Sequence, residues 1–220
     1  MATQKLIRWS GLSLMLGGIG FAVHLITHPP GETAEYAFYP LWVPSHLLGS
    51  IASMLILFGL VGLYARQSEK IGVSGLIGFI LTFVGFTLSA GALIFISVIF
   101  VPFLAAQGMD SFVDPKGPLF TSSAMQLTVG VSALCLLLGL LLFAITTLRA
   151  RVLPRWGAWL IILTVPLGIV GGVFIFFIGT SLQGILQTLL GVLLGLGLAA
   201  WGWALWSEKG EMVAQAKATM

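Results

Sequence analysis

The segment His24–His46, HLITHPPGETAEYAFYPLWVPSH, joins two long apolar runs and decides how the chain is expected to fold. It contains all three histidines, two of the seven acidic residues and four of the nine prolines. Two consecutive prolines disfavour a continuing helix, so the helix before the segment should end near Pro29. The next helix should begin near Pro44, because proline suits a first helical turn. The segment therefore predicts a polar cap over one end of a helical bundle.

The composition on both sides of this cap is typical of an integral membrane protein. Of the 220 residues, 58% are hydrophobic and only 8% are charged, and the mean hydropathy is +1.08. Soluble domains carry about 25% charged residues. The 28 glycines fit helices that pack closely in lipid. The long unbroken apolar runs argue against a β-barrel, whose strands alternate over about ten residues.

Intervals without charge give the membrane-spanning helices, each of which needs about 20 apolar residues. The interval 156–207 is too long for one helix, so we expect it to fold back at the polar sequence GTSLQG, 179–184. The fold class is therefore an all-α integral membrane protein, with a six-helix transmembrane domain over 1–206 and a polar cytoplasmic tail over 207–220. The predicted helices are about 6–27, 44–64, 72–100, 122–148, 157–178 and 185–206, with a short charged turn at 65–70.

The basic residues set the expected orientation. Lys116 falls on one side of the predicted bundle, and the other nine basic residues fall on the opposite side with both termini. By the positive-inside rule, we expect a multi-pass protein of the cell membrane that is N-in and C-in. The same distribution explains the pI near 9.3 without nucleic acid as a partner. The nine residues are Lys5, Arg8, Arg66, Lys70, Arg149, Arg151, Arg155, Lys209 and Lys217.

A weak internal repeat accompanies this pattern. In chain order, the second, fourth and sixth predicted helices each begin with a polar residue three or four positions before a glycine. The first, third and fifth carry clustered small residues. Three helical hairpins of one design would explain it, through a duplicated ancestor, but glycine-rich membrane helices also resemble one another by chance. Both explanations stay open. The polar and glycine pairs are His46 with Gly49, Gln126 with Gly130, and Gln187 with Gly191.

The three histidines form the first candidate site. His24 and His28 are four residues apart, so they share a face if the helix persists, and His46 opens the next helix at the same predicted end. A divalent metal could be held by His24, His28 and His46. A haem could be ligated by His24 and His46. The third interpretation is structural, with imidazoles that bond to the loop backbone, and the deeper His24 is the most notable because polar groups in a bilayer need partners.

Glutamines form the second candidate site. Gln126, Gln183 and Gln187 fall on the same predicted side as the histidines, where the helices starting near 44, 122 and 185 present their positive dipole ends. His46, Gln126, Gln183 and Gln187 are therefore candidates to line an outward-facing cavity for a small solute. The alternative is that the glutamines form hydrogen bonds between helices.

Gly191, Gly195 and Ala199 form a row of small residues that predicts close helix packing, within the bundle or between protomers. The sequence contains no recognisable catalytic motif, so an enzyme is the less favoured class. Three functions remain. The first is a structural or accessory membrane protein, in contact with the lipid bilayer and a membrane-protein partner or a second copy of itself. The others are a haem- or metal-binding redox subunit and a small-solute carrier or channel.

Overall fold

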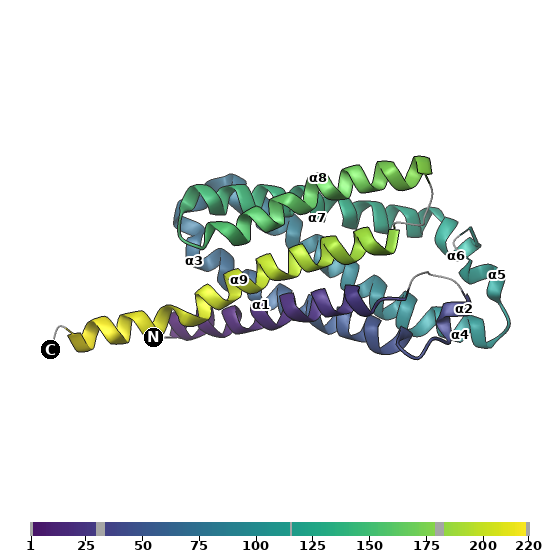
Figure 1. Ribbon diagram of the computed structural model, residues 1–220, viewed down its shortest axis with the longest axis horizontal. Coiled ribbons are helices and arrows are strands. Elements are labelled where there is room, and N and C mark those ends of the chain that lie inside the picture. Colours follow the sequence, from purple (N-terminus) through teal and green to yellow (C-terminus); the bar gives the residue numbers. More distant parts are fainter. Residues whose placement is uncertain (1, 30–33, 115, 179–182, 219–220) are drawn as a thin grey trace.

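The computed structural model describes residues 2–29, 34–114, 116–178 and 183–218, and every regular element in these ranges is a helix (Figure 1). The long helices lie side by side along one axis. They are α1 (Ala2–Thr27), α3 (Trp42–Ala92), α7 (Ser123–Ala150), α8 (Arg155–Ile178) and α9 (Gln183–Ala218). Shorter pieces are α2 (Ala34–Ala37), the π-helix η1 (Leu93–Phe100), α4 (Val101–Ala106), α5 (Asp110–Val113) and α6 (Pro118–Thr121).

Helix α3 folds back on itself at Gly72. Its backbone there has φ 59° and ψ −163°, a conformation that glycine adopts without the steric cost of a Cβ. The Tyr64 and Phe79 rings, on either side of this break, stack with centroids 4.7 Å apart. The charged turn predicted at 65–70 is therefore wrong, because those residues are helical and the chain reverses at Gly72. We call residues 42–71 and 73–92 the first and second limbs of α3.

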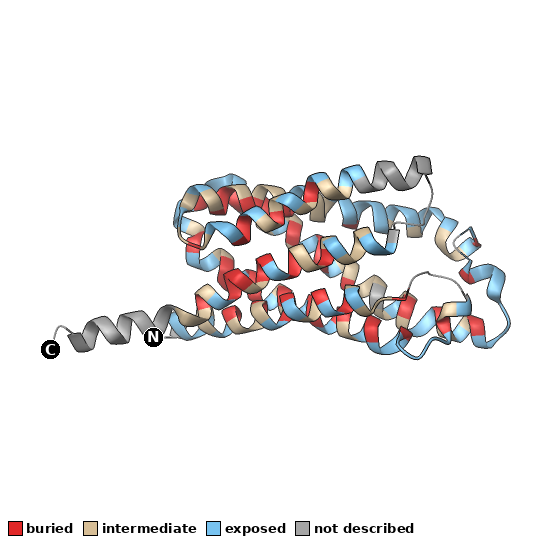
Figure 2. Ribbon diagram, viewed as in Figure 1, coloured by how far each residue is buried: buried red, intermediate tan, exposed pale blue. Residues whose placement is uncertain are grey.

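Helix α1 packs between the first limb of α3 and α9. The hydroxyl of Ser13 donates to the carbonyl of Leu55 over 2.8 Å. A Cβ built on Gly18 would lie 2.5 Å from the carbonyl oxygen of Gly195, so the backbones of α1 and α9 touch. The second limb of α3 packs on α7 in the same way, where Ser132 donates to the carbonyl of Gly85 over 3.0 Å. Figure 2 shows that the buried residues follow these shared faces.

Helix α8 completes the bundle by packing against α7 and α9. The indole N–H of Trp201 on α9 donates to the carbonyl of Pro154 just before α8, over 3.3 Å. Helix α9 does not end near Trp206 but continues to Ala218, through the segment that was predicted to be a separate polar tail.

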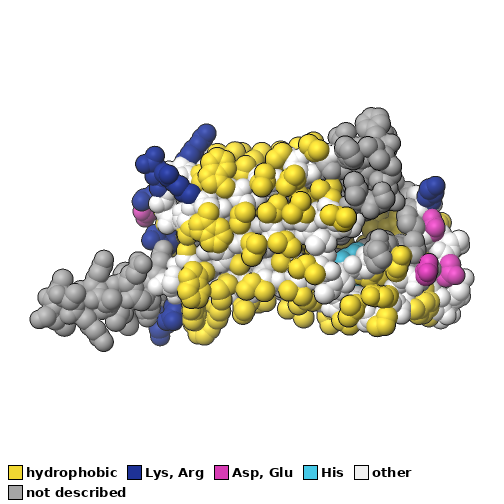
Figure 3. All heavy atoms as spheres, viewed as in Figure 1, with side chains coloured by type: hydrophobic (Ala, Val, Ile, Leu, Met, Phe, Trp, Pro, Cys, Tyr) yellow, Lys and Arg dark blue, Asp and Glu magenta, His cyan; other side chains and the backbone are white. Residues whose placement is uncertain are grey.

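Four helical stretches are long and apolar enough to cross a membrane, judged by length and composition: Gln4–Thr27, Trp42–Ala106, Ser123–Ala150 and Gly184–Ser207. The stretch Trp42–Ala106 includes both limbs of α3, and the described part of α8 adds a shorter apolar helix, Arg155–Val170. Large apolar side chains also cover the middle of the outer surface (Figure 3). The protein is thus an all-helical, membrane-embedded protein.

The two ends of the bundle differ in charge (Figure 3). Most described Lys and Arg side chains gather at the end that holds the N-terminus, whereas Asp and Glu side chains predominate at the other end. Lys116 follows α5, and its backbone N–H donates to the carboxylate of Asp114. We call the two ends the arginine end, which includes Arg149, Arg151 and Arg155, and the histidine end, which includes His24, His28 and His46. Twenty residues of continuous helix separate His46 from Arg66, so the two residues belong to opposite ends.

Candidate functional site: a histidine cluster

The three imidazoles predicted to lie at one end meet between the end of α1 and the first turn of α3. The ring centroids of His28 and His46 are 4.8 Å apart, those of His24 and His28 are 5.4 Å apart, and those of His24 and His46 are 5.7 Å apart. His24 is 2% exposed and His46 is 0% exposed, whereas His28 is partly exposed. Two segments thus bring their histidines into one contiguous cluster.

Hydrogen bonds fix the orientation of two of these rings. Nδ1 of His46 lies 2.7 Å from the carbonyl oxygen of Trp42, and Nδ1 of His28 lies 2.7 Å from the carbonyl oxygen of Pro29. Because a carbonyl can only accept, Nδ1 carries the proton in both rings. In the neutral rings, Nε2 is therefore the nitrogen whose lone pair can accept a hydrogen bond or bind a metal ion.

Ser45 ties His24 to the start of α3. Its hydroxyl oxygen lies 3.1 Å from Nδ1 of His24 and 3.1 Å from the hydroxyl oxygen of Thr27. The same hydroxyl is 3.1 Å from the carbonyl oxygen of His24 and can donate to it. These contacts give the buried imidazole of His24 a polar neighbour inside an apolar bundle, as buried polar groups require.

Trp42 covers the cluster from the outside. Its ring lies 4.5 Å from the ring of His46, and its indole N–H donates to the carbonyl of Ser97 over 2.5 Å. Trp42 also belongs to a small apolar cluster with Ala37, Val101, Ala105 and Val113, from α2, α4 and α5. Figure 3 shows a small area of histidine on one face of this end. His24 and His46 are buried by the surrounding packing.

Gly49 makes room for His24. A Cβ on Gly49 would lie 2.6 Å from Cδ2 of His24, which is closer than real Cβ contacts allow. The pairing of His46 with Gly49, noted as part of the sequence repeat, thus has a local explanation. One turn of helix carries His46 of the cluster and then Gly49, which leaves space for the ring of His24.

The predicted glutamines lie on α7 and α9, whereas the histidines lie at the end of α1 and on α3. Gln126 is exposed on the first turns of α7, and Gln187 is partly buried on α9. The side chain of Gln183 lies outside the described residues. Within the described residues, no hydrogen bond joins Gln126 or Gln187 to a histidine. The solute cavity predicted from these residues stays a prediction.

The geometry adds little to the haem and metal interpretations. His24 and His46 meet edge to face at 5.7 Å, so no gap separates the two rings for a haem macrocycle. Among the described residues, no group of three or more His, Cys, Asp and Glu side chains is arranged to hold a metal ion. The binding roles predicted for His24, His28 and His46 therefore stay untested.

The row Gly191, Gly195 and Ala199 packs against α1 inside the bundle. A Cβ on Gly191 would meet the side chain of Leu25, and a Cβ on Gly195 would meet the backbone of Gly18. A Cβ on Gly18 would in turn lie 2.8 Å from the backbone nitrogen of Ala199. The small residues thus let α9 approach α1 beside the histidine end.

Comparison with known proteins gives no family for this chain. No protein-family model matches it, and no similar curated protein or solved structure was found. Any function therefore has to be argued from the geometry of the chain itself.

Proposed function

We propose that the chain is a structural or accessory membrane protein with six spans and cytoplasmic termini, and that the histidine cluster closes its outer end. The six spans are α1, the two limbs of α3, α7, α8 and α9. The first limb alone, at about 1.5 Å per residue, is longer than the roughly 30 Å hydrocarbon core. The gathering of basic side chains at one end supports placing that end in the cytoplasm (Figure 3).

One observation favours the structural role over the redox and carrier functions. The imidazoles contact one another and their immediate neighbours, and Trp42 packs against them. His24 and His46 are buried, the Nδ1 atoms of His28 and His46 face backbone carbonyls, and Trp42 lies over His46. A side chain enclosed in this way contributes to packing and to hydrogen bonding.

The test is to purify the full chain in detergent and record its absorbance spectrum and metal content. We expect no Soret band and no stoichiometric metal, and we expect His24→Ala and His46→Ala to unfold more easily than the unmodified protein. A Soret band that disappears in either variant would show that the histidines serve a haem and would overturn the structural proposal.

The orientation has a separate test in a variant in which Cys135 is replaced by serine. Lys70→Cys at the arginine end and Ser111→Cys at the histidine end are both at exposed positions. A membrane-impermeant maleimide added outside intact cells should label Ser111→Cys and leave Lys70→Cys unlabelled until the membrane is opened. Labelling of both from the same side would contradict the proposed topology.

Binding of a divalent metal is the second candidate, favoured by one observation. The closest pair of rings, His28 and His46 at 4.8 Å, has both Nδ1 atoms turned to carbonyls, which leaves Nε2 as the nitrogen suited to a metal. If this function is right, purified protein should take up Zn²⁺ at one ion per chain, and His28→Ala should abolish the uptake. Unchanged uptake in His28→Ala would exclude the candidate.

A further inference from the structure

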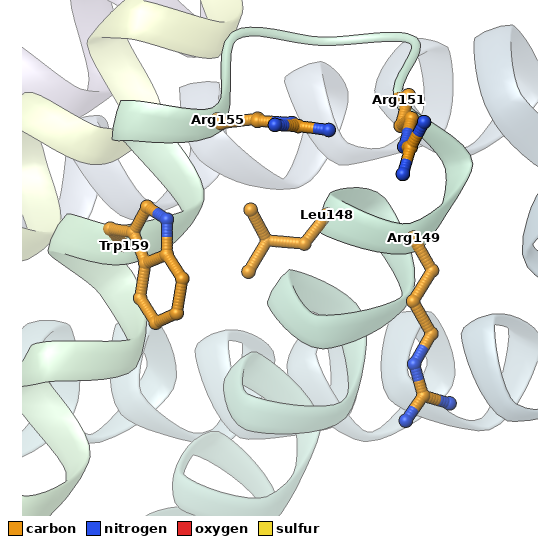
Figure 4. A pocket seen from close by; sticks show the side chains of 5 residues that line it. All are labelled: Leu148, Arg149, Arg151, Arg155 and Trp159. Atoms are coloured by element: carbon orange, nitrogen blue, oxygen red, sulfur yellow. The ribbon is translucent and has the colours of Figure 1, made fainter.

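A pocket of about 370 Å³ lies at the arginine end, between the end of α7 and the start of α8 (Figure 4). Three arginines from the turn region and two apolar side chains surround it. The lining residues are Leu148, Arg149, Arg151, Arg155 and Trp159. The pocket is more than 20 residues along α7 from the helix's start at the histidine end, so it is a separate feature of the molecule.

The turn between α7 and α8 places the three arginines around one pocket. Helix α7 ends at Ala150, and Arg151 adopts the left-handed conformation, with φ 54° and ψ 30°, while its N–H donates to the carbonyl of Thr147 over 3.2 Å. The chain then reverses and α8 begins at Arg155. In Figure 4 the side chain of Arg155 extends toward Arg151, which lies on the other side of the turn.

Within the described residues, no carboxylate neutralises the arginines of this pocket through an ion pair. Arg149, Arg151 and Arg155 are all exposed. The dipoles of the two helices offset each other, because the negative end of α7 meets the positive end of α8. The guanidinium groups therefore set the local potential, and an anion would relieve their mutual repulsion.

The other wall of the pocket is apolar. Trp159 is 60% exposed and lies one turn into α8, and Leu148 lies two residues before the end of α7. Tryptophan is enriched where hydrocarbon gives way to headgroups, and arginines at the same depth reach phosphates. One side of the pocket thus suits a charged group, and the other side suits the aliphatic part of the same molecule.

We propose that this pocket binds the phosphate group of an anionic phospholipid. The planar guanidinium groups of Arg151 and Arg155 present paired N–H donors that match phosphate oxygens. Trp159 and Leu148 then flank the glycerol and the first acyl carbons. A soluble phosphate ester carries the same oxygens but no acyl chain, so the two sources can be separated by experiment.

The test uses the full chain in detergent and measures binding of phosphatidylglycerol and phosphatidylcholine by native mass spectrometry. We expect the unmodified protein to prefer phosphatidylglycerol, and the double variant Arg151→Gln with Arg155→Gln to bind it about tenfold more weakly. The matched control is Lys5→Gln with Lys70→Gln, which removes the same charge at the same end outside the pocket. We expect this control to stay within about twofold of the unmodified protein. An equal loss in both double variants, or no loss in the first, would overturn the proposal.

Two further variants guard against a simple folding defect. Arg151→Lys with Arg155→Lys keeps the charge and removes the paired donors, so it should retain phosphatidylcholine binding and lose part of the preference for phosphatidylglycerol. Trp159→Phe should weaken phosphatidylglycerol binding more than Trp156→Phe, because Trp156 is equally exposed but does not line the pocket. If the lysine variant binds as the unmodified protein does, the pocket recognises charge alone and the proposed geometry is wrong.

Inorganic phosphate identifies the source of the ligand. If millimolar phosphate leaves phosphatidylglycerol bound, the apolar wall of the pocket contributes to binding and the ligand is a lipid, as proposed. If phosphate displaces the lipid at equal concentration, the lipid assignment is overturned in favour of a soluble phosphate ester. The result is independent of the histidine cluster, because His46→Ala should leave lipid preference unchanged even where it lowers stability.

Discussion

The two ends of the bundle hold their ionisable side chains in opposite ways. At the histidine end, His24 and His46 are buried, and Nδ1 of each ring faces a neighbouring hydroxyl or carbonyl group. At the arginine end, Arg151 and Arg155 are exposed beside an open pocket. A buried polar group has to be satisfied by the protein, whereas an exposed charge interacts with its surroundings. We infer that substitutions at the first end change stability, and substitutions at the second change binding.

The largest loss of stability is expected for His46→Ala. The side chain is 0% exposed, contacts the rings of His24, His28 and Trp42, and bonds to the carbonyl of Trp42. Its removal leaves a cavity and removes a side-chain hydrogen bond, which together cost about 2–4 kcal/mol. Denaturant unfolding in detergent measures the change, with the partly exposed His28→Ala as the milder control. If the two variants lose equal stability, burial of His46 is not what stabilises this end.

A smaller loss is expected for Gly49→Ala, which acts on the same cluster through His24. The added methyl would press on the His24 ring, and overpacking of this kind costs about 1–3 kcal/mol. Gly130→Ala is the matched control, since nothing lies within 4 Å of its Cβ position on α7. Alanine there should add roughly 0.5–1 kcal/mol of stability, because glycine weakens a helix interior. A Gly49→Ala protein as stable as the control would mean that His24 moves away at no cost.

Much of this comparison could be predicted from the sequence, because the charges and histidines are separated along it by apolar runs of helical length. Two features that fix the ends could not. The sequence ARQSEK, 65–70, favours helix, so no local pattern shows that the chain reverses only at Gly72. The bond from Trp42 to Ser97 joins residues 55 positions apart, and no short-range pattern reports such a contact.

The faces of the helices were also beyond prediction. Gln126 was predicted to line a cavity with His46; it is exposed on α7, and the cavity stays a prediction. A helix that is apolar on all sides has no stripe to show which face turns inward. Ser45 was missed for a related reason: it stands beside His46 in the sequence, yet its role depends on contact with His24, 21 residues earlier.

At the arginine end, Arg151→Gly should separate binding from stability. Arg151 has φ 54°, a conformation in which glycine avoids the cost of a Cβ, so the variant should gain about 0.5–1 kcal/mol. The same change removes a guanidinium group from the pocket and should weaken binding of phosphatidylglycerol. Arg155→Gln is the control, with weaker binding and no gain in stability. A loss of stability in Arg151→Gly would show that the arginine side chain supports the fold, and would end the contrast between the two ends.

The smallest effect is expected for Thr147→Val, which examines a buried polar group at the arginine end. Thr147 is 1% exposed, and its hydroxyl has no hydrogen-bond partner among the described residues. Valine has nearly the same shape, so removing an unsatisfied buried hydroxyl should be neutral or should stabilise by up to about 1 kcal/mol. The matched control is Thr82→Val on the facing limb of α3, whose buried hydroxyl donates to the carbonyl of Gly78 over 2.8 Å. That variant should lose about 1 kcal/mol in the same unfolding assay. If Thr147→Val loses as much, a buried hydroxyl at the arginine end contributes to stability as the histidine cluster does, and the division between the two ends is one of degree.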